Sequence, residues 1–256
     1  MLLAIDVGNT NCTVGIYDGR HKLGNWRIST EGRRTADEYA VWLTQLLGLA
    51  GIATEAIDNV IIASVVPSAT FNLEWLCRKH LHCEPMVVTT ALDLGIQVHI
   101  DNPKEAGADR LVNALAARNT YGNNLIVIDI GTATTFDIVD GEGNYAGGII
   151  APGPHPSLEA LHHIAAKLPK VEIERPDRVV GKGTVGAMQS GIYWGYVSLI
   201  EGLIARIQEE MGRSMTVIST GGLAVLFTEA MAAIDHYDAE LTMRGLLEVF
   251  ERNRRS

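Results

Sequence analysis

Apolar and polar positions along the chain form short runs typical of buried strands, and one strand-turn-strand pattern occurs twice. The first copy runs from Leu3 to Asp18 and the second from Leu125 to Asp140. Each copy is an apolar run, then Asp-x-Gly, then small hydroxyl or amide residues, then a returning β-prone run. Each copy is closed by an Asp-Gly pair, which favours a tight hairpin turn. The repeat therefore predicts two similar halves that both open with a hairpin.

The remaining pattern alternates strands with helical stretches and predicts a mixed α/β order. A capping box is expected at Thr35 and Glu38, and Thr184 is expected to cap a long helix that ends near Met211. A stiff proline loop over 152–156 should precede a helix from Leu158 to Leu168, capped by Ser157. Further strands are expected at 22–28, 60–66, 85–88, 144–151 and 216–220, and further helices at 36–47, 70–82 and from 238 onwards.

The length of 256 residues suits either one large domain or two domains of roughly 120 residues. The repeat favours two halves, 1–118 and 119–256, that meet at a cleft. A hydrophobic content of 47% is enough to build a core in each half.

Charge and cysteine content exclude several classes of function. The formal net charge of −9 argues against nucleic-acid binding, which needs a basic stripe. No apolar run approaches the roughly 18 residues that a membrane span requires. The three cysteines do not form a disulfide framework, and the chain starts directly in a strand without a basic leader. We therefore expect a cytoplasmic protein that contacts neither nucleic acid nor membrane.

The two Asp-x-Gly turns are candidates for binding phosphate groups. A glycine lets the backbone approach a ligand closely, and the turn's N–H groups with Thr or Asn side chains can bind phosphate oxygens. Asp6 and Asp129, at the strand ends, can hold a hydrated divalent cation, which prefers oxygen ligands. A single copy could equally be an ordinary β-turn. Two copies at corresponding points suggest two loops that hold one polyphosphate.

Of two later glycine-rich stretches that could form nucleotide-binding loops, only the second remains a candidate. Lys182 invites comparison with a phosphate-binding P-loop, but Pro176 occupies the place of the first glycine and Gly183 follows the lysine. That assignment fails. The strand over 216–220 runs into Gly221-Gly222, a turn at which backbone could lie flat against a purine or ribose.

The segment Gly107-Ala108-Asp109-Arg110 lies early in a predicted helix and allows two interpretations. An Asp-Arg pair at a helix start can simply complement the helix dipole as a surface ion pair. Alternatively, Asp109 is a carboxylate that accepts a proton from a substrate hydroxyl.

Two Asp-x-Gly hairpins and a late strand-Gly-Gly turn resemble the superfamily of actin, the heat-shock chaperone ATPases and the sugar kinases. Within it, the chain resembles the type III pantothenate kinases over nearly its whole length. The resemblance implies a duplicated ribonuclease-H-like fold, an actin-like ATPase with two mixed-sheet halves flanked by helices and an interdomain cleft. The motifs that carry it are 6–11, 34–38, 102–103, 107–110, 128–135, 147–148, 151–153 and 189–191.

The resemblance also implies an activity and a set of site residues. The activity is the ATP-dependent phosphorylation of pantothenate to 4'-phosphopantothenate, the first step of coenzyme A synthesis. Asp109 would be the general base, Asp129 would bind K⁺ or NH₄⁺, and Asp6 would hold Mg²⁺ through water. The family works as a homodimer that encloses substrate at the subunit interface. ATP would contact Asp6, Val7, Gly8, Asn9, Thr10, Asn11, Cys12, Thr13 and Thr132, and pantothenate would contact Gly107, Ala108, Asp109, Arg110 and Thr184.

Four departures from the family pattern lie on the expected substrate side. Ile100 stands where many members have Tyr, Gly183 stands where many have Asn, and Gly186 is small for its place. The stretch Pro154-His155-Pro156 replaces an apolar-polar-apolar sequence. These changes leave two alternatives open: a non-catalytic regulator like Bvg accessory factor, or a kinase for another small alcohol.

Overall fold

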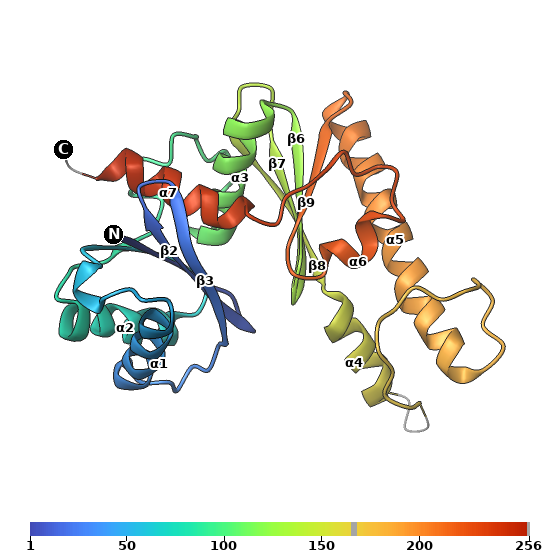
Figure 1. Ribbon diagram of the computed structural model, residues 1–256. Coiled ribbons are helices and arrows are strands. Elements are labelled where there is room, and N and C mark those ends of the chain that lie inside the picture. The colour runs from blue at the N-terminus through green and yellow to red at the C-terminus, as the bar shows by residue number, and fades with distance from the viewer. Residues whose placement is uncertain (165–167, 255–256) are drawn as a thin grey trace. The chain divides into compact units, whose positions relative to one another are not determined.

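A computed structural model of the protein describes residues 1–164 and 168–254. Contacts divide the chain into two compact units (Figure 1). The first unit is Met1–Ala116 together with the terminal segment that starts at Glu240, and the second is Ala117–Ala239. Each unit has its own five-stranded sheet and its own hydrophobic core.

The sheet of the first unit has the order β3-β2-β1-β4-β5. The first three strands form an antiparallel meander, and β4 and β5 extend the sheet in parallel. The central strand β1 is almost wholly apolar and buried, whereas the edge strand β3 is largely exposed. The bounds are β1 (Leu2–Val7), β2 (Asn11–Asp18), β3 (His21–Ser29), β4 (Asn59–Ser64) and β5 (Met86–Val87).

The sheet of the second unit repeats this arrangement strand for strand. Its order is β10-β9-β6-β7-β8, with β6, β7 and β8 antiparallel and β9 and β10 added in parallel to β6. The strands are β6 (Leu125–Ile130), β7 (Ala133–Val139), β8 (Tyr145–Pro152), β9 (Thr216–Thr220) and β10 (His236–Tyr237). The matching orders and directions confirm the predicted duplicated ribonuclease-H-like fold.

Helices α1 and α2 cover one face of the first sheet and pack with β1, β2 and β4 in one core (Figure 1). The predicted capping box is confirmed, because the backbone N–H of Glu38 donates to Thr35 and the Glu38 carboxylate accepts from the Thr35 N–H. The helical segments are α1 (Ala36–Leu49), η1 (Thr54–Ala56), α2 (Pro67–Leu76), η2 (Cys77–Leu81), η3 (Pro103–Glu105), α3 (Ala108–Tyr121) and α7 (Leu241–Asn253).

The terminal helix α7 packs within the first unit. A side chain at Gly245 would overlap the backbone of Val112, so this glycine lets α7 approach α3 closely. The Thr242 hydroxyl on α7 donates to the side-chain oxygen of Asn113 on α3, over 2.8 Å. The division into halves 1–118 and 119–256, made from the sequence repeat, remains a prediction. By its contacts within the fold, the segment that starts at Glu240 belongs to the first unit.

The second unit carries α4 (Pro154–Ile164), α5 (Thr184–Met211) and α6 (Ala224–Thr228). One core joins α5 and α6 to the sheet, with Tyr193 stacked on Phe227 at a centroid separation of 5.3 Å. The aromatic side of α5 therefore contributes to the core of its own unit.

Several predicted boundaries differ from the structure. The strand expected over 60–66 ends at Ser64, and Pro67 begins α2 as its first residue. Helix α4 begins at Pro154 instead of Leu158, because prolines are tolerated in a first turn, where N–H groups have no intrahelical acceptor. Ser157 therefore does not cap the helix, and its hydroxyl donates back to the carbonyl of Gly153 over 2.8 Å.

The helix expected to reach Leu168 is described as far as Ile164, residues 165–167 lie outside the described residues, and Leu168 itself is not helical. Thr184 is the first residue of α5, and Gly183 occupies the cap position without a side-chain bond. The end of this helix at Met211 is as predicted.

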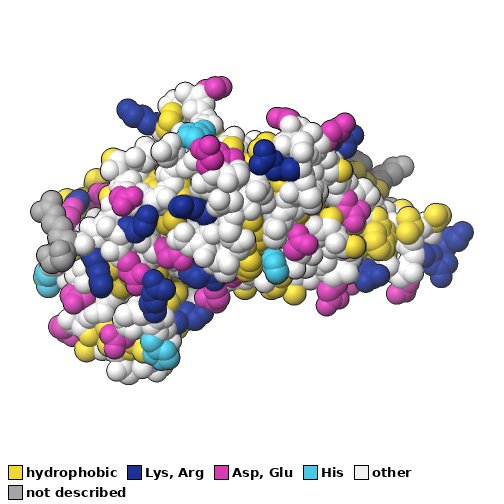
Figure 2. Space-filling model, turned by 90° about the horizontal axis from the view of Figure 1, so that it is seen from above, with side chains coloured by type: hydrophobic (Ala, Val, Ile, Leu, Met, Phe, Trp, Pro, Cys, Tyr) yellow, Lys and Arg dark blue, Asp and Glu magenta, His cyan; other side chains and the backbone are white. Residues whose placement is uncertain are grey.

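The surface agrees with the acidic composition. On the face drawn in Figure 2, Lys and Arg side chains are interspersed with Asp and Glu and are not gathered into one stripe. Among the described helices, none combines the length and the apolar character that a membrane crossing needs.

Candidate active site

The first Asp-x-Gly turn is a tight reversal between β1 and β2. The N–H of Gly8 donates to the carbonyl of Asn11 over 3.0 Å, and Val7 pairs directly with Cys12. Thr30, at the end of β3, braces the turn, because its N–H donates to the Thr10 carbonyl and its hydroxyl to the Gly8 carbonyl, each over 2.8 Å. The turn is thus fixed from outside while its tip stays open.

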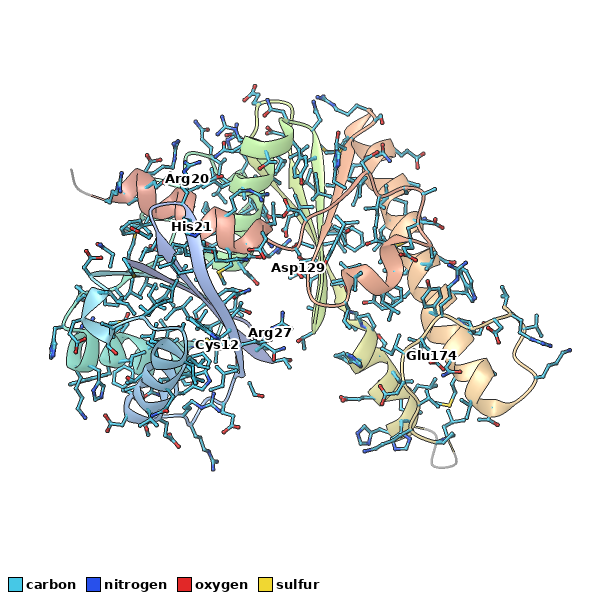
Figure 3. The ribbon with its side chains drawn as sticks, in the orientation of Figure 1. Cys12, Arg20, His21, Arg27, Asp129 and Glu174 are labelled. Atoms are coloured by element: carbon cyan, nitrogen blue, oxygen red, sulfur yellow. The ribbon has the colours of Figure 1, made fainter. Side chains whose placement is uncertain are left out.

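Side chains of this first loop divide into a buried set and an exposed set. Val7 and Cys12 are fully buried in the core of the first unit, so only their backbone is available to a ligand (Cys12 is labelled in Figure 3). Asn9, Thr10 and Asn11 are exposed, and Asp6 and Thr13 are half-buried opposite each other at the strand ends. Burial, with a smaller contribution from the nearby Asp6 carboxylate, raises the pKa of the Cys12 thiol to about 12.

The second Asp-x-Gly turn has the same construction between β6 and β7. The N–H of Gly131 donates to the carbonyl of Ala133 over 3.0 Å, and Asp129 pairs with Thr135 as Asp6 pairs with Thr13. Asp129, labelled in Figure 3, is half-buried near the end of β6. Thr132 is exposed at the tip of the turn.

Two further glycines hold the second turn, and both have no room for a side chain. Gly221 has φ +96°, and a Cβ there would overlap the Asp129 carboxylate and lie 2.7 Å from the Ile130 nitrogen. Gly153 donates its N–H to the Thr132 carbonyl over 2.9 Å, and its Cβ would overlap the carbonyls of Gly131 and Thr132. The structure thus places Gly221 beside the carboxylate, a contact that the sequence did not indicate.

The glycines inside the two turns differ from these packing glycines. A Cβ at Gly8 would come no closer than 3.4 Å to the Asn11 carbonyl, and one at Gly131 no closer than 3.6 Å to the Ala133 carbonyl. Neither glycine has a positive φ. The chain's own packing therefore does not demand glycine at these two points, which is the situation expected where a ligand approaches the backbone.

Asp109 is the second residue of α3 and is half-buried, with Gly107 immediately below its carboxylate. The Arg110 N–H donates to Asp109 Oδ1 over 2.8 Å, and a Cβ at Gly107 would lie 2.5 Å from the same oxygen. Burial raises the pKa of Asp109, and the hydrogen bond and charge of Arg110 lower it by less. A desolvated carboxylate with a raised pKa is a better proton acceptor than an exposed surface aspartate.

Thr184 is exposed at the start of α5, beside an open pocket of about 360 Å³ lined by the segment before the helix and by its first turns. Gly181 packs closely on the first turn of α5, where a Cβ would overlap the backbone of Ala187 and Gly186. A Cβ at Gly186 would lie 3.8 Å from the Gly181 Cα, an ordinary contact, so the packing requires glycine at position 181 and not at position 186. The lining residues are Glu174, Arg175, Pro176, Asp177, Arg178, Gly181, Lys182, Gly186 and Gln189.

The candidate residues thus fall into two groups, each within one unit. The first unit holds the loop from Asp6 to Thr13 and the start of α3 from Gly107 to Arg110. The second unit holds Asp129, Thr132 and Thr184.

The chain is similar in sequence to one family of kinases. The family model described as type III pantothenate kinase matches residues 2–206. A type III pantothenate kinase from Phenylobacterium zucineum is 56% identical, over 99% of this chain and 98% of that protein. One from Paramagnetospirillum magneticum is 59% identical, over 99% and 98%.

Solved structures with low sequence identity share the fold. A protein from Campylobacter jejuni, named provisionally as a Baf family transcriptional activator, matches with a TM-score of 0.59 at 18% identity over 98% of both chains. The ROK hexokinase of Thermus thermophilus matches with a TM-score of 0.50 at 13% identity over 97% of both chains. Likeness at this level of identity concerns the fold alone.

Proposed function

Because the chain belongs to the type III pantothenate kinase family, we propose a role for each of its candidate residues in the reaction of that family. The protein is a kinase that uses ATP to phosphorylate pantothenate, giving 4'-phosphopantothenate in coenzyme A synthesis. Family membership over nearly the whole chain is the observation that carries this function.

The two turns bind the phosphate groups of ATP. In the first, Asn9, Thr10 and Asn11 offer exposed groups at the tip, the half-buried Gly8 lets the backbone be approached, and Val7 and Cys12 contribute backbone only. Asp6 and Thr13 stand at the base of this turn, and Thr132 is the exposed contact on the second turn. The support is that both turns are braced from outside and that neither internal glycine is required by packing.

Asp109 is the general base on the pantothenate hydroxyl. Phosphoryl transfer passes through a loose transition state, so the enzyme supplies position and charge and forms no covalent intermediate. A carboxylate whose pKa is raised by burial can accept the hydroxyl proton as the phosphoryl group arrives. Gly107, Ala108 and Arg110 line the same helix start, and Thr184 contacts pantothenate from the start of α5.

Two cations complete the proposed chemistry. Asp6 would hold Mg²⁺ through water, and Asp129 would hold a monovalent cation, K⁺ or NH₄⁺. Both are half-buried carboxylates at a strand end next to a phosphate turn, and such oxygen donors suit these ions. When bound, the cations neutralise phosphate charge.

We further infer a cytoplasmic homodimer that binds neither nucleic acid nor membrane. The acidic composition and the mixed surface charge support the absence of a nucleic-acid site. The dimer is the assembly that the family resemblance implies.

A coupled assay of ADP release tests these roles. Wild type should release ADP with pantothenate, and Asp109→Asn should lose about 10²- to 10⁴-fold of the rate while it still binds ATP. Asp101→Asn, an exposed carboxylate in the preceding loop, is the matched control and should keep the wild-type rate. Normal turnover by the Asp109 variant would remove it from the role of base.

The same assay addresses the two alternatives raised by the sequence. A regulator would release no ADP with any alcohol, and a kinase for another alcohol would prefer a different member of a substrate panel. Replacing K⁺ with Na⁺ at equal ionic strength tests the role of Asp129, and equal rates in both salts would count against it.

A further inference from the structure

A buried carboxylate in the second sheet has no part in the roles proposed so far. Asp137, on β7, is 0% exposed and accepts two hydroxyl hydrogen bonds. The Tyr145 hydroxyl donates to Oδ1 over 2.9 Å, and the Thr135 hydroxyl donates to Oδ2 over 3.1 Å. Burying a carboxylate in a core costs free energy unless the carboxylate is well hydrogen-bonded, so a buried aspartate at this position suggests a specific role.

The strand register connects this carboxylate to Asp129. Thr135 and Asp137 are two residues apart on β7, so their side chains point to the same face of the sheet. Thr135 pairs directly with Asp129 on β6, and opposed residues of an antiparallel pair share a face at a Cβ separation of about 4.5–5.5 Å. Asp129, Thr135 and Asp137 therefore form a row along one face.

The hydroxyl proton of Thr135 determines how its oxygen can interact with its neighbours. A threonine hydroxyl has a single proton and two lone pairs. Since Thr135 gives its proton to Asp137, its oxygen can act toward the Asp129 side only as an acceptor. An acceptor oxygen beside a carboxylate is the type of donor set that a hard monovalent cation prefers.

We propose that Asp137 is a positioning residue that orients Thr135 as an oxygen ligand for the cation at Asp129. The inference rests on the proposed cation role of Asp129 and extends it to two residues with no other assigned role. The Tyr145 hydroxyl donates to the other oxygen of Asp137, Oδ1, whereas Thr135 donates to Oδ2.

Substitutions on the row separate this role from a structural one. Thr135→Val keeps the shape of the side chain and removes the oxygen, whereas Thr135→Ser keeps the oxygen. Asp137→Asn can donate to Thr135 through its amide and so turns the hydroxyl proton toward the cation side. Tyr145→Phe is the matched control, because it removes a bond to the same carboxylate without touching Thr135.

The test measures the midpoint of thermal unfolding in KCl and in NaCl at equal ionic strength, and the KCl concentration that gives half-maximal activity. Wild type should be stabilised specifically by KCl. Thr135→Val and Asp137→Asn should raise the half-maximal KCl concentration by about 10- to 100-fold and lose the specific stabilisation. Thr135→Ser and Tyr145→Phe should keep the wild-type response to KCl.

The possible failures point to different proposals. If wild type responds to KCl and Thr135→Val responds equally, Thr135 is not a ligand and the inference is wrong, while the role of Asp129 stands. If wild type itself does not distinguish KCl from NaCl, the cation role of Asp129 falls and this inference falls with it. A KCl response lost equally in Tyr145→Phe would show that Asp137 acts through general stability of the sheet.

Discussion

At the scale of single residues, the protein holds two groups whose ionisation is shifted in useful directions. Burial raises the pKa of the Asp109 carboxyl, and it also raises the pKa of the Cys12 thiol beside the first Asp-x-Gly turn. A neutral thiol adds no negative charge where ATP phosphates are proposed to bind. Each shift has a consequence that can be measured.

Asp109→Asn should make the protein more stable near neutral pH while it destroys activity. The folded protein holds Asp109 at a pKa above its ordinary value, so wild-type stability falls as pH rises from that ordinary value through the raised one. The asparagine of the variant does not ionise, so the variant does not lose this stability as pH rises. The difference in unfolding free energy between variant and wild type should therefore grow with pH through that window and then stay constant.

Urea unfolding of both proteins across the pH range measures this difference. Asp101→Asn, at an exposed aspartate, should show no such growth. An Asp109→Asn variant less stable than wild type at neutral pH would contradict the burial argument. The acidic limb of kcat/KM for wild type should also lie above the ordinary range of an aspartate, because that limb reports the base in the free enzyme.

Cysteine labelling offers a second measurement at this scale. With a pKa of about 12, Cys12 holds on the order of 10⁻⁴ of its thiol as thiolate at pH 8, and it is fully buried. Cys83 is only half-buried, and a hydrogen bond from Cys77 lowers its pKa. Iodoacetamide should therefore modify Cys83 in the native protein, and mass spectrometry should find Cys12 modified only after unfolding. Native labelling of Cys12 at a rate like that of Cys83 would contradict its burial.

At the scale of elements, the glycines in and around the two Asp-x-Gly turns are of two kinds. Gly8 and Gly131 lie inside the turns with room for a methyl group, whereas Gly153 and Gly221 are packed against the second turn with none. The first kind is compatible with a ligand that needs access to backbone, and the second kind maintains the shape of the turn. Only the structure separates the two, because the sequence shows glycine in both cases.

Gly131→Ala should weaken ATP binding and leave the fold nearly unchanged. The added methyl meets only ordinary contacts within the chain, so the unfolding free energy should change by no more than about 1 kcal/mol. Gly153→Ala is the contrasting variant, since its methyl would overlap two carbonyls of the turn and should destabilise the protein by about 1–3 kcal/mol or more. Calorimetric ATP titration with thermal unfolding checks both variants, and wild-type ATP affinity in Gly131→Ala would exclude the second turn from phosphate binding.

Elements that depend on interactions between residues close together in the sequence could be predicted from the sequence. The Thr35–Glu38 capping box and the two hairpins were predictable because caps and tight turns are set within a few residues. The start of α4 at Pro154 was missed because three prolines and a glycine within five residues also suit a loop. The contact of Gly221 with Asp129 and the row through Thr135 depend on strand register, which no local pattern fixes.

At the scale of the whole molecule, the duplicated halves are not two independent lengths of chain. The first unit is completed by α7, whose residues Leu241, Leu246 and Val249 are fully buried. The first unit contains the proposed ATP loop and the proposed base, so α7 supports residues far from it in sequence. None of the proposed site residues lies on α7 itself.

Leu246→Ala should therefore reduce activity through the stability of the first unit alone. Removing a fully buried leucine side chain should lower the unfolding free energy by about 2–5 kcal/mol. Hydrogen exchange should rise in β1 and β4, which α7 contacts, and should stay at the wild-type level in β6 and β9 of the second unit. Arg254→Ala, at an exposed position that ends the same helix, is the control and should change stability by less than about 0.5 kcal/mol. Faster exchange in β6 and β9 as well would mean that the two units unfold as one, and the division of the molecule argued from its contacts would then not describe its stability.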